Sequence, residues 1–166
     1  MFANRPRIKL PRTRTDWAME VAAALGLLTT VLVASVSFPG LPPQIPTHFN
    51  LAGEPDGWGP RATIFLLPGL GVVLHVLLTF AAKIPHRCNY LWPITEQNAP
   101  RQYLLARRVM NLLKAQIVWM FAIFTWRMTA IGRGEAAQLG LWHVGLLLAL
   151  IVGTLLWYIA SASRAR

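Results

Sequence analysis

Charged residues are scarce in this chain. They make up 13% of its 166 residues, against roughly 25% in a typical soluble domain, and only six residues are acidic. The single cysteine, Cys88, excludes an intrachain disulfide. The sequence contains no H-E-x-x-H motif, no phosphate-binding loop and no Ser/His/Asp or Cys/His arrangement. These absences argue against a soluble domain, a disulfide scaffold and an enzyme with a familiar catalytic motif.

Apolar residues are abundant instead, at 55% of the chain, and they gather in four long runs. A helix needs about 20 residues to cross the hydrocarbon core of a bilayer. The first run follows a basic segment, as in a cleaved signal peptide, but its length and the poor cleavage site at 35–37 favour a retained span. The sequence predicts an all-α membrane protein, a four-transmembrane-helix bundle. Its expected parts are a basic tail at 1–16, a membrane domain at 17–160 with spans at 17–38, 64–84, 105–126 and 139–160, and a tail at 161–166.

Three details of these spans can be predicted. Pro68 should kink the second span near its outer end, because proline frees a backbone carbonyl. The third helix should begin near Gln102, before its span, and end at Trp126, followed by a polar turn. Small residues recur every fourth position in the first span, which would let another helix approach closely: Ala18, Ala22, Gly26, Thr30 and Ala34.

Polar residues that could carry a function are concentrated in the loop at 39–61. Its prolines exclude a helix, and its Asn, Asp and Gly residues indicate turns near 51–54 and 55–59. Loops of this length are usually functional or disordered. The loop also holds apolar residues that could bury it against the bundle, so we expect a folded, proline-rich cap. These are Leu41, Ile45, Phe49, Leu51 and Trp58.

The same loop carries a longer motif, L-P-x-x-I-P-x-H-F-N-x-x-G-x-P-D-x-W-G, at residues 41–59. This motif resembles the N-terminal membrane domain, of uncharacterised function, found in SdpI-type toxin-immunity proteins. The resemblance implies a bacterial multi-pass membrane protein. In that family the immunity activity belongs to longer proteins with a second conserved membrane region, which has no match in residues 100–166.

Basic residues are distributed unevenly between the two ends of the predicted bundle. If the N-terminus lies inside the cell, twelve of the sixteen Lys and Arg residues fall on inner segments. Arg61, Arg127 and Arg133 fall outside, and Lys114 lies within a span. The positive-inside rule therefore predicts both termini in the cytoplasm and the 39–61 loop outside the cell membrane. The basic charge then indicates contact with anionic lipid rather than with nucleic acid.

Four polar residues of the loop form the candidate binding site: His48, Asn50, Glu54 and Asp56. Their donor atoms would suit a divalent metal, although the spacing matches no standard metal motif. In a structural interpretation, Asn50 and Asp56 cap turns while His48 and Glu54 bond backbone amides. In a third interpretation, the set recognises an extracytoplasmic ligand.

A second polar group lies within the spans, where ionisable residues are costly and often functional. It comprises Glu20, His75, Asn111 and Lys114. Arg107, Asn111 and Lys114 share one face of the third helix. Glu20 and Lys114 could pair inside the bundle, with His75 or Asn111 nearby. Alternatively, Lys114 could snorkel, with its ammonium reaching the inner head groups.

The sequence thus favours a non-enzymatic membrane protein that binds or senses something at the extracytoplasmic face, with a role in toxin immunity or signalling implied by the resemblance. Its expected partners are the lipid bilayer and either a membrane protein or an extracytoplasmic peptide. One alternative is a structural or accessory membrane subunit. Another is a metal-dependent membrane enzyme or transporter, the only case in which a cofactor, a divalent metal at the 48–56 loop, is expected.

Overall fold

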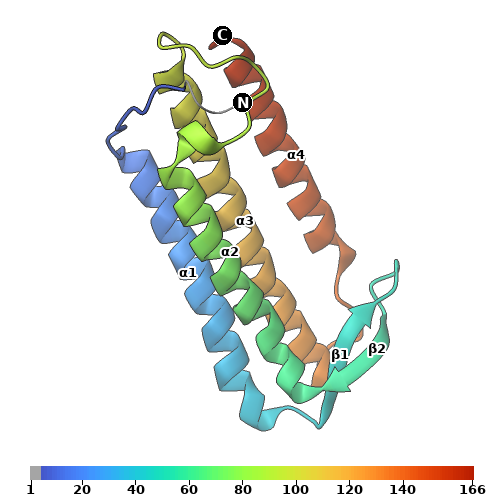
Figure 1. The fold of residues 1–166 in the computed structure, drawn as a ribbon. Helices are drawn as coiled ribbons and strands as arrows, with labels where there is room; N and C mark the ends of the chain where they lie inside the picture. The colour runs from blue at the N-terminus through green and yellow to red at the C-terminus, as the bar shows by residue number, and fades with distance from the viewer. Residues whose placement is uncertain (1–4) are drawn as a thin grey trace.

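The computed structural model describes residues 5–166, and it is built from four long helices and one hairpin (Figure 1). All four helices are long and apolar enough to cross a membrane, which confirms the predicted fold class. They are α1 (Arg14–Ser37), α2 (Leu66–Lys83), α3 (Ala99–Gly132) and α4 (Leu141–Ser163). The hairpin strands are β1 (Gln44–Phe49) and β2 (Pro55–Pro60), and three short 3₁₀ helices are η1 (Phe38–Gly40), η2 (Arg61–Phe65) and η3 (Pro85–Arg87).

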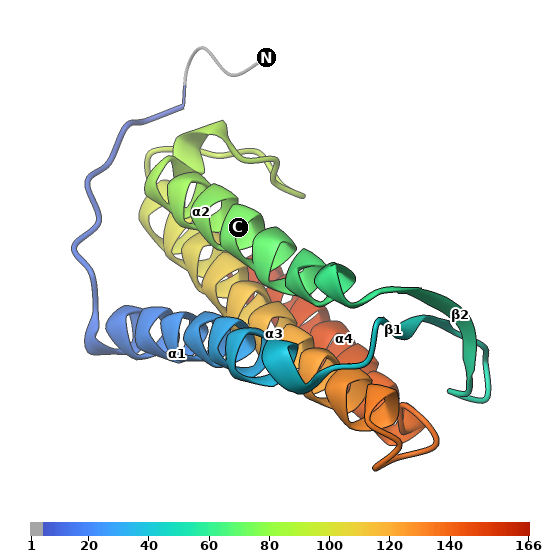
Figure 2. The same cartoon turned by 90° about the horizontal axis from the view of Figure 1, so that it is seen from below.

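Helix α3 is the centre of the bundle. It packs against α1, α2 and α4, and Figures 1 and 2 place α1 and α4 on opposite sides of it. Two side chains of α3 make hydrogen bonds to α4: Gln116 donates to Thr154 Oγ1 at 2.7 Å and Gln102 donates to Ala162 O at 2.9 Å. The N-terminal segment from residue 5 and the C-terminus lie at one end of the bundle, and the hairpin lies at the other (Figure 1). The two ends of the bundle therefore present different sets of residues.

Small residues bring α1 and α3 together, as the sequence predicts. A Cβ atom on Gly26 would lie only 2.9 Å from Val118 Cγ2. The Thr30 hydroxyl donates to Gly26 O at 2.8 Å and Val118 O at 3.2 Å, and Trp119 Nε1 donates to Ala22 O at 3.0 Å. Close backbone approach and interhelical hydrogen bonds are the usual sources of helix association in lipid.

The predicted end of the third helix is wrong. Helix α3 is 34 residues long, about 51 Å at 1.5 Å per residue, and it continues through Arg127 to Gly132. The Arg127 side chain donates to the carbonyls of Gln138 and Leu139 in the α3–α4 connection, so its charge does not end the helix. Pro68 lies in the first turn of α2, directly after η2. No intrahelical N–H is needed there, so α2 accommodates the proline at its start.

The 39–61 loop forms a two-stranded antiparallel hairpin rather than an irregular loop. Ile45 pairs with Gly59 and Pro46 with Trp58, and the register shifts next to His48. The predicted turn at 51–54 is present, but the predicted turn at 55–59 is strand β2. Both strands of a two-stranded ribbon are edge strands, where proline is tolerated. Gly57 lies opposite His48, and a Cβ atom there would lie 2.8 Å from His48 Cβ.

The hairpin is anchored to the bundle by one small core. Ile45 is fully buried, and it packs with Ala34 of α1, Ile64 of η2 and Met128 of α3. At the hairpin turn, Leu139 N donates to Gly53 O at 2.8 Å. The predicted cap therefore exists, but two of its expected buried residues are exposed: Leu51 is 97% exposed and Trp58 is 51% exposed.

Candidate functional site

The polar residues of the hairpin separate into two pairs. His48 of β1 and Asp56 of β2 face each other, with Nδ1 and Oδ1 2.5 Å apart. Their side chains are 75% and 43% exposed. Asp56 therefore pairs with a side chain and does not cap a turn. The pair is displayed on the surface, where solvent screens it and makes it a weak contributor to stability.

Asn50 and Glu54 shape the hairpin turn. Asn50 Oδ1 accepts hydrogen bonds from the backbone N–H groups of Ala52 at 2.8 Å and Glu54 at 3.0 Å. Asn50 Nδ2 also donates to Glu54 Oε2 at 3.0 Å. Gly53, between them, has a φ of +79°, which favours glycine. Asn50 therefore caps the turn, as the structural interpretation predicts. Glu54, by contrast, bonds the Asn50 side chain and not a backbone amide.

The metal interpretation would need at least three clustered ligands at the hairpin. Across residues 5–166, no group of three or more His, Cys, Asp or Glu side chains is arranged to hold a metal ion. His48 and Asp56 bond each other, whereas Glu54 bonds Asn50. The arrangement presents an imidazole and a carboxylate to solvent, and this combination can exchange hydrogen bonds with a bound partner.

A second polar region lies between α1 and α3, toward the end of the bundle that holds the termini. Arg107 Nη2 lies 2.8 Å from Asp16 Oδ2, and Lys114 Nζ lies 2.6 Å from Glu20 Oε2. Asp16 and Glu20 are one turn apart on α1, and Arg107 and Lys114 are two turns apart on α3. We call these two ion pairs the rungs, because each connects α1 to α3 and they follow one another along the bundle. Buried ion pairs of this kind require good geometry to offset desolvation.

Lys114 is the most deeply buried of these charges, with no exposed surface. Besides Glu20, its ammonium donates to Thr79 Oγ1 of α2 at 2.8 Å. The side chain therefore joins three helices and does not extend along the lipid-facing surface toward the head groups. Breaking one partner of such a pair leaves a buried charge uncompensated.

The two other predicted intramembrane residues lie near these rungs without bonding them. Asn111 is 2% exposed and falls between Arg107 and Lys114 on α3. Within residues 5–166, its Oδ1 has no hydrogen-bond partner, and the same holds for His75 Nδ1. Glu20 and Lys114 are thus brought together, while Asn111 and His75 remain beside the pair.

The chain before α1 folds over this end of the bundle. Arg107 donates to the carbonyls of Leu10 at 3.1 Å and Pro11 at 3.0 Å, and the Tyr103 hydroxyl donates to Pro6 O at 3.1 Å. The Thr13 side chain caps α1, with Asp16 completing the capping box. Sequence reasoning missed Asp16 and Tyr103 as site residues. The four-residue spacing of Asp16 and Glu20, opposite Arg107 and Lys114, was the available signal.

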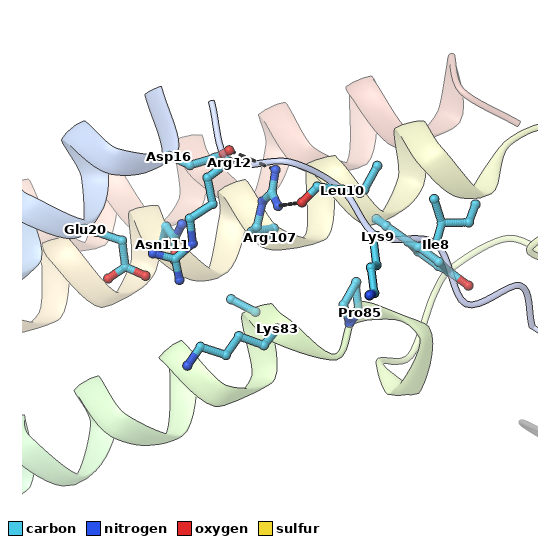
Figure 3. Close-up of a pocket in the computed structure, with 12 residues that line it drawn as sticks. Ile8, Lys9, Leu10, Arg12, Asp16, Glu20, Lys83, Pro85, Arg107 and Asn111 are labelled. Atoms are coloured by element: carbon cyan, nitrogen blue, oxygen red, sulfur yellow. Dashed lines mark hydrogen bonds and ion pairs between the residues drawn. The ribbon is translucent and has the colours of Figure 1, made fainter. Parts of the chain in front are cut away.

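These elements enclose a cavity of about 250 Å³ (Figure 3). Its walls come from the N-terminal segment, α1, the end of α2 with η3, and the first turns of α3. The lining residues are Ile8, Lys9, Leu10, Arg12, Asp16, Glu20, Ala82, Lys83, Pro85, Tyr103, Arg107 and Asn111. Basic, acidic and amide groups meet in one space, so this cavity is a second candidate site beside the hairpin.

Comparisons with known proteins match part of this chain. A family model described as a domain of unknown function, DUF1648, matches residues 25–72, from the middle of α1 through the hairpin into α2. An uncharacterised protein from the archaeon Archaeoglobus fulgidus is 27% identical over 74 residues, which cover 45% of this chain and 40% of the archaeal protein. No solved structure matches. The family match includes His48, Asn50, Glu54 and Asp56 and excludes the rungs between α1 and α3.

Proposed function

We propose that this protein is a small multi-pass membrane protein that uses its hairpin to bind a ligand or a partner at the extracytoplasmic face. The resemblance to SdpI-type proteins suggests a bacterial cell membrane, and an extracytoplasmic peptide or a membrane protein as the bound molecule. Toxin immunity or signalling would be the physiological role. The hairpin residues His48 and Asp56 would make the contact, while Asn50 and Glu54 would hold the turn that presents them.

The observation that carries this proposal is an exposed polar pair on a firmly anchored hairpin. Ile45 is fully buried and the turn is bonded to the α3–α4 connection, whereas His48 is 75% exposed. Leu51 and Trp58 add exposed apolar surface to the same hairpin. Aromatic and apolar groups beside a few polar ones are typical of binding surfaces.

The proposed orientation places the hairpin outside the cell and both termini in the cytoplasm. It rests on the twelve basic residues at the termini end against three at the hairpin end. A cytoplasm-active reporter fused after Arg166 should be active, and a periplasm-active reporter inserted at the exposed residue Leu51 should be active as well. Activity of both reporters on the same side of the membrane would contradict this topology.

Replacing His48 with alanine should remove partner binding without weakening the fold. Because the His48–Asp56 pair is exposed, His48→Ala should change the free energy of unfolding by less than about 0.5 kcal/mol. A photo-crosslinking amino acid at Leu51, in full-length protein in its native membrane, should form an adduct that His48→Ala abolishes. The mass of that adduct distinguishes a peptide from a membrane protein.

Two controls accompany this experiment. His86→Ala, at the opposite end of the chain's fold, should leave the adduct intact. Asn50→Ala should lower stability by about 1 kcal/mol, because the backbone N–H groups of Ala52 and Glu54 lose their acceptor. An adduct that persists at full yield in both His48→Ala and Asp56→Ala would contradict a role for this pair.

The second candidate function is an accessory membrane subunit, and one observation favours it. Only 6% of the apolar window of α4 is buried, and this helix packs chiefly along α3. A larger assembly could cover the rest of α4. An adduct formed from the exposed residue Leu148 of α4, together with none from Leu51, would favour this alternative over hairpin binding.

A further inference from the structure

The cavity at the termini end has a charge pattern that the hairpin function does not explain. Lys9 and Arg12 approach it from the N-terminal segment, and Lys83 approaches from the last turn of α2 (Figure 3). All three are exposed residues, so they mark the open side of the cavity. Of the ion pairs within residues 5–166, none involves these three side chains. The opening therefore carries three positive charges without carboxylate partners, although Arg12 lies over the Trp17 ring at 4.8 Å and Lys83 over the Phe80 ring at 5.1 Å.

The deep wall of the cavity holds buried groups with unused hydrogen-bonding capacity. Asp16 is 1% exposed and Asn111 is 2% exposed. In the part of the chain that the structure describes, Asp16 Oδ1 and Asn111 Oδ1 lack a donor, and Arg107 Nε lacks an acceptor. Buried polar atoms are usually paired, since leaving one unpaired is costly. These atoms have less than 1 Å² of accessible surface, so a ligand in the cavity would pair with them once the side chains around them shift.

We propose that this cavity binds an anionic phosphate ester with a hydroxylated head group. The phosphate lies among Lys9, Arg12 and Lys83 at the opening, and the hydroxyl groups donate to Asn111 Oδ1 and Asp16 Oδ1 at the deep wall. Two sources share this chemistry: the head group of a lipid such as phosphatidylglycerol, and soluble glycerol phosphate. The site lies at the opposite end of the bundle from the hairpin, so it is independent of the proposed hairpin function.

Both halves of the site are needed to select this chemical class. A carboxylate, or a phosphodiester without head-group hydroxyls, would match the basic opening but would leave the deep acceptors without donors. A neutral polyol would satisfy the acceptors but not the three positive charges. A ligand that carries a phosphate and free hydroxyls matches both walls at once.

The size and the position of the cavity fit a lipid head group. Its volume of about 250 Å³ would hold roughly eight water molecules at about 30 Å³ each, and it falls below the about 300–1,000 Å³ of pockets that enclose drug-sized ligands. Helix α1 begins at Arg14 and α2 ends at Lys83, so the cavity opens where two apolar spans reach their polar ends. Basic pockets between spans at this level bind anionic head groups.

The first test measures binding to the full-length protein in a non-ionic detergent by native mass spectrometry. Dioctanoyl phosphatidylglycerol should bind on the order of a hundredfold more tightly than dioctanoyl phosphatidylcholine. The variant Lys9→Gln/Arg12→Gln/Lys83→Gln should lose this preference. The matched variant Arg7→Gln/Arg14→Gln/Arg87→Gln removes the same charge from exposed residues at the same end that do not line the cavity, and it should retain binding within about threefold.

Competition by glycerol 3-phosphate distinguishes the two sources. Displacement of the lipid by a similar concentration of glycerol 3-phosphate identifies the soluble ester as sufficient, whereas no displacement identifies the lipid. Either result supports a site for a hydroxylated phosphate ester, provided that the triple variant of Lys9, Arg12 and Lys83 no longer binds the ligand. Equal binding of phosphatidylglycerol and phosphatidylcholine, or equal losses in the two triple variants, would overturn the proposal.

The second test concerns the hydroxyl groups. Dioctanoyl phosphatidylmethanol carries the same phosphodiester charge without head-group hydroxyls, and wild type should bind it about fivefold less tightly than phosphatidylglycerol. Asn111→Leu should remove this difference while keeping its affinity for phosphatidylmethanol. If wild type binds the two lipids equally, the hydroxyl assignment is wrong, and this result does not depend on whether Asn111→Leu folds.

Discussion

Lys114→Met should lower the free energy of unfolding by about 3–5 kcal/mol, because it leaves the Glu20 carboxylate without its partner inside the bundle. Lys114 has no exposed surface, and its ammonium also bonds Thr79 Oγ1. Methionine matches the four-atom stem of lysine and lacks only its ammonium, so the loss reports the charge and its hydrogen bonds. Unfolding in mixed micelles, followed by helix content, measures the difference.

A double-mutant cycle shows whether this loss comes from the Glu20–Lys114 pair. Glu20→Gln with Lys114→Met should cost less than the sum of the two single changes, because neither variant side chain leaves a buried charge. Lys83→Met is the control, since Lys83 is exposed at the end of α2, and it should cost less than about 0.5 kcal/mol. If the two single losses of stability simply add, or if Lys83→Met and Lys114→Met cost the same, then the effect of Lys114→Met does not come from its pairing with Glu20.

Ile45→Ala should destabilise the attachment of the hairpin by about 2–5 kcal/mol, the range for large-to-small changes in a packed core. Ile45 is fully buried among residues from α1, η2 and α3. A Cβ atom on Gly132 would lie 3.1 Å from Ile45 Cγ2, so the contact with α3 is tight. Thermal melting and the rate of proteolysis within residues 50–54 should both report the loss.

Leu51→Ala is the matched control for this prediction, because Leu51 lies on the same hairpin and is 97% exposed. It should change stability by less than about 0.5 kcal/mol. Trp58→Ala should cost much less than Ile45→Ala, although tryptophan is the larger residue, because Trp58 is 51% exposed. If Trp58→Ala destabilised the protein more than Ile45→Ala did, the hairpin would be held to the bundle mainly through Trp58 and not through Ile45.

The candidate residues could be named from the sequence, and so could the Glu20–Lys114 pair as one alternative to snorkelling, but the sequence could not choose between the two or pair Arg107 with Asp16. Arg107, Asn111 and Lys114 fall on one face of a helix by their spacing alone. Which of them meets Glu20 depends on the rotation and the axial shift of α1 against α3, and the close approach at Gly26 sets both. In the hairpin, the turn at Asn50 follows from local chemistry, whereas the pairing of His48 with Asp56 needs the β1–β2 register.

The four spans were determined by the sequence itself, because the length of an apolar run is a property of consecutive residues and lipid requires each run to form a helix. Tertiary structure decided where α3 ends and what surrounds its charges. Arg107 and Arg127 resemble span boundaries in the sequence, but the charge of Arg107 is met by Asp16, which is 91 residues away along the chain, and that of Arg127 by carbonyls of the α3–α4 connection. The cavity likewise exists only because the N-terminal segment folds back over α3 through Arg107 and Tyr103. No local pattern encodes such a contact, since it depends on groups that meet only after the helices have packed.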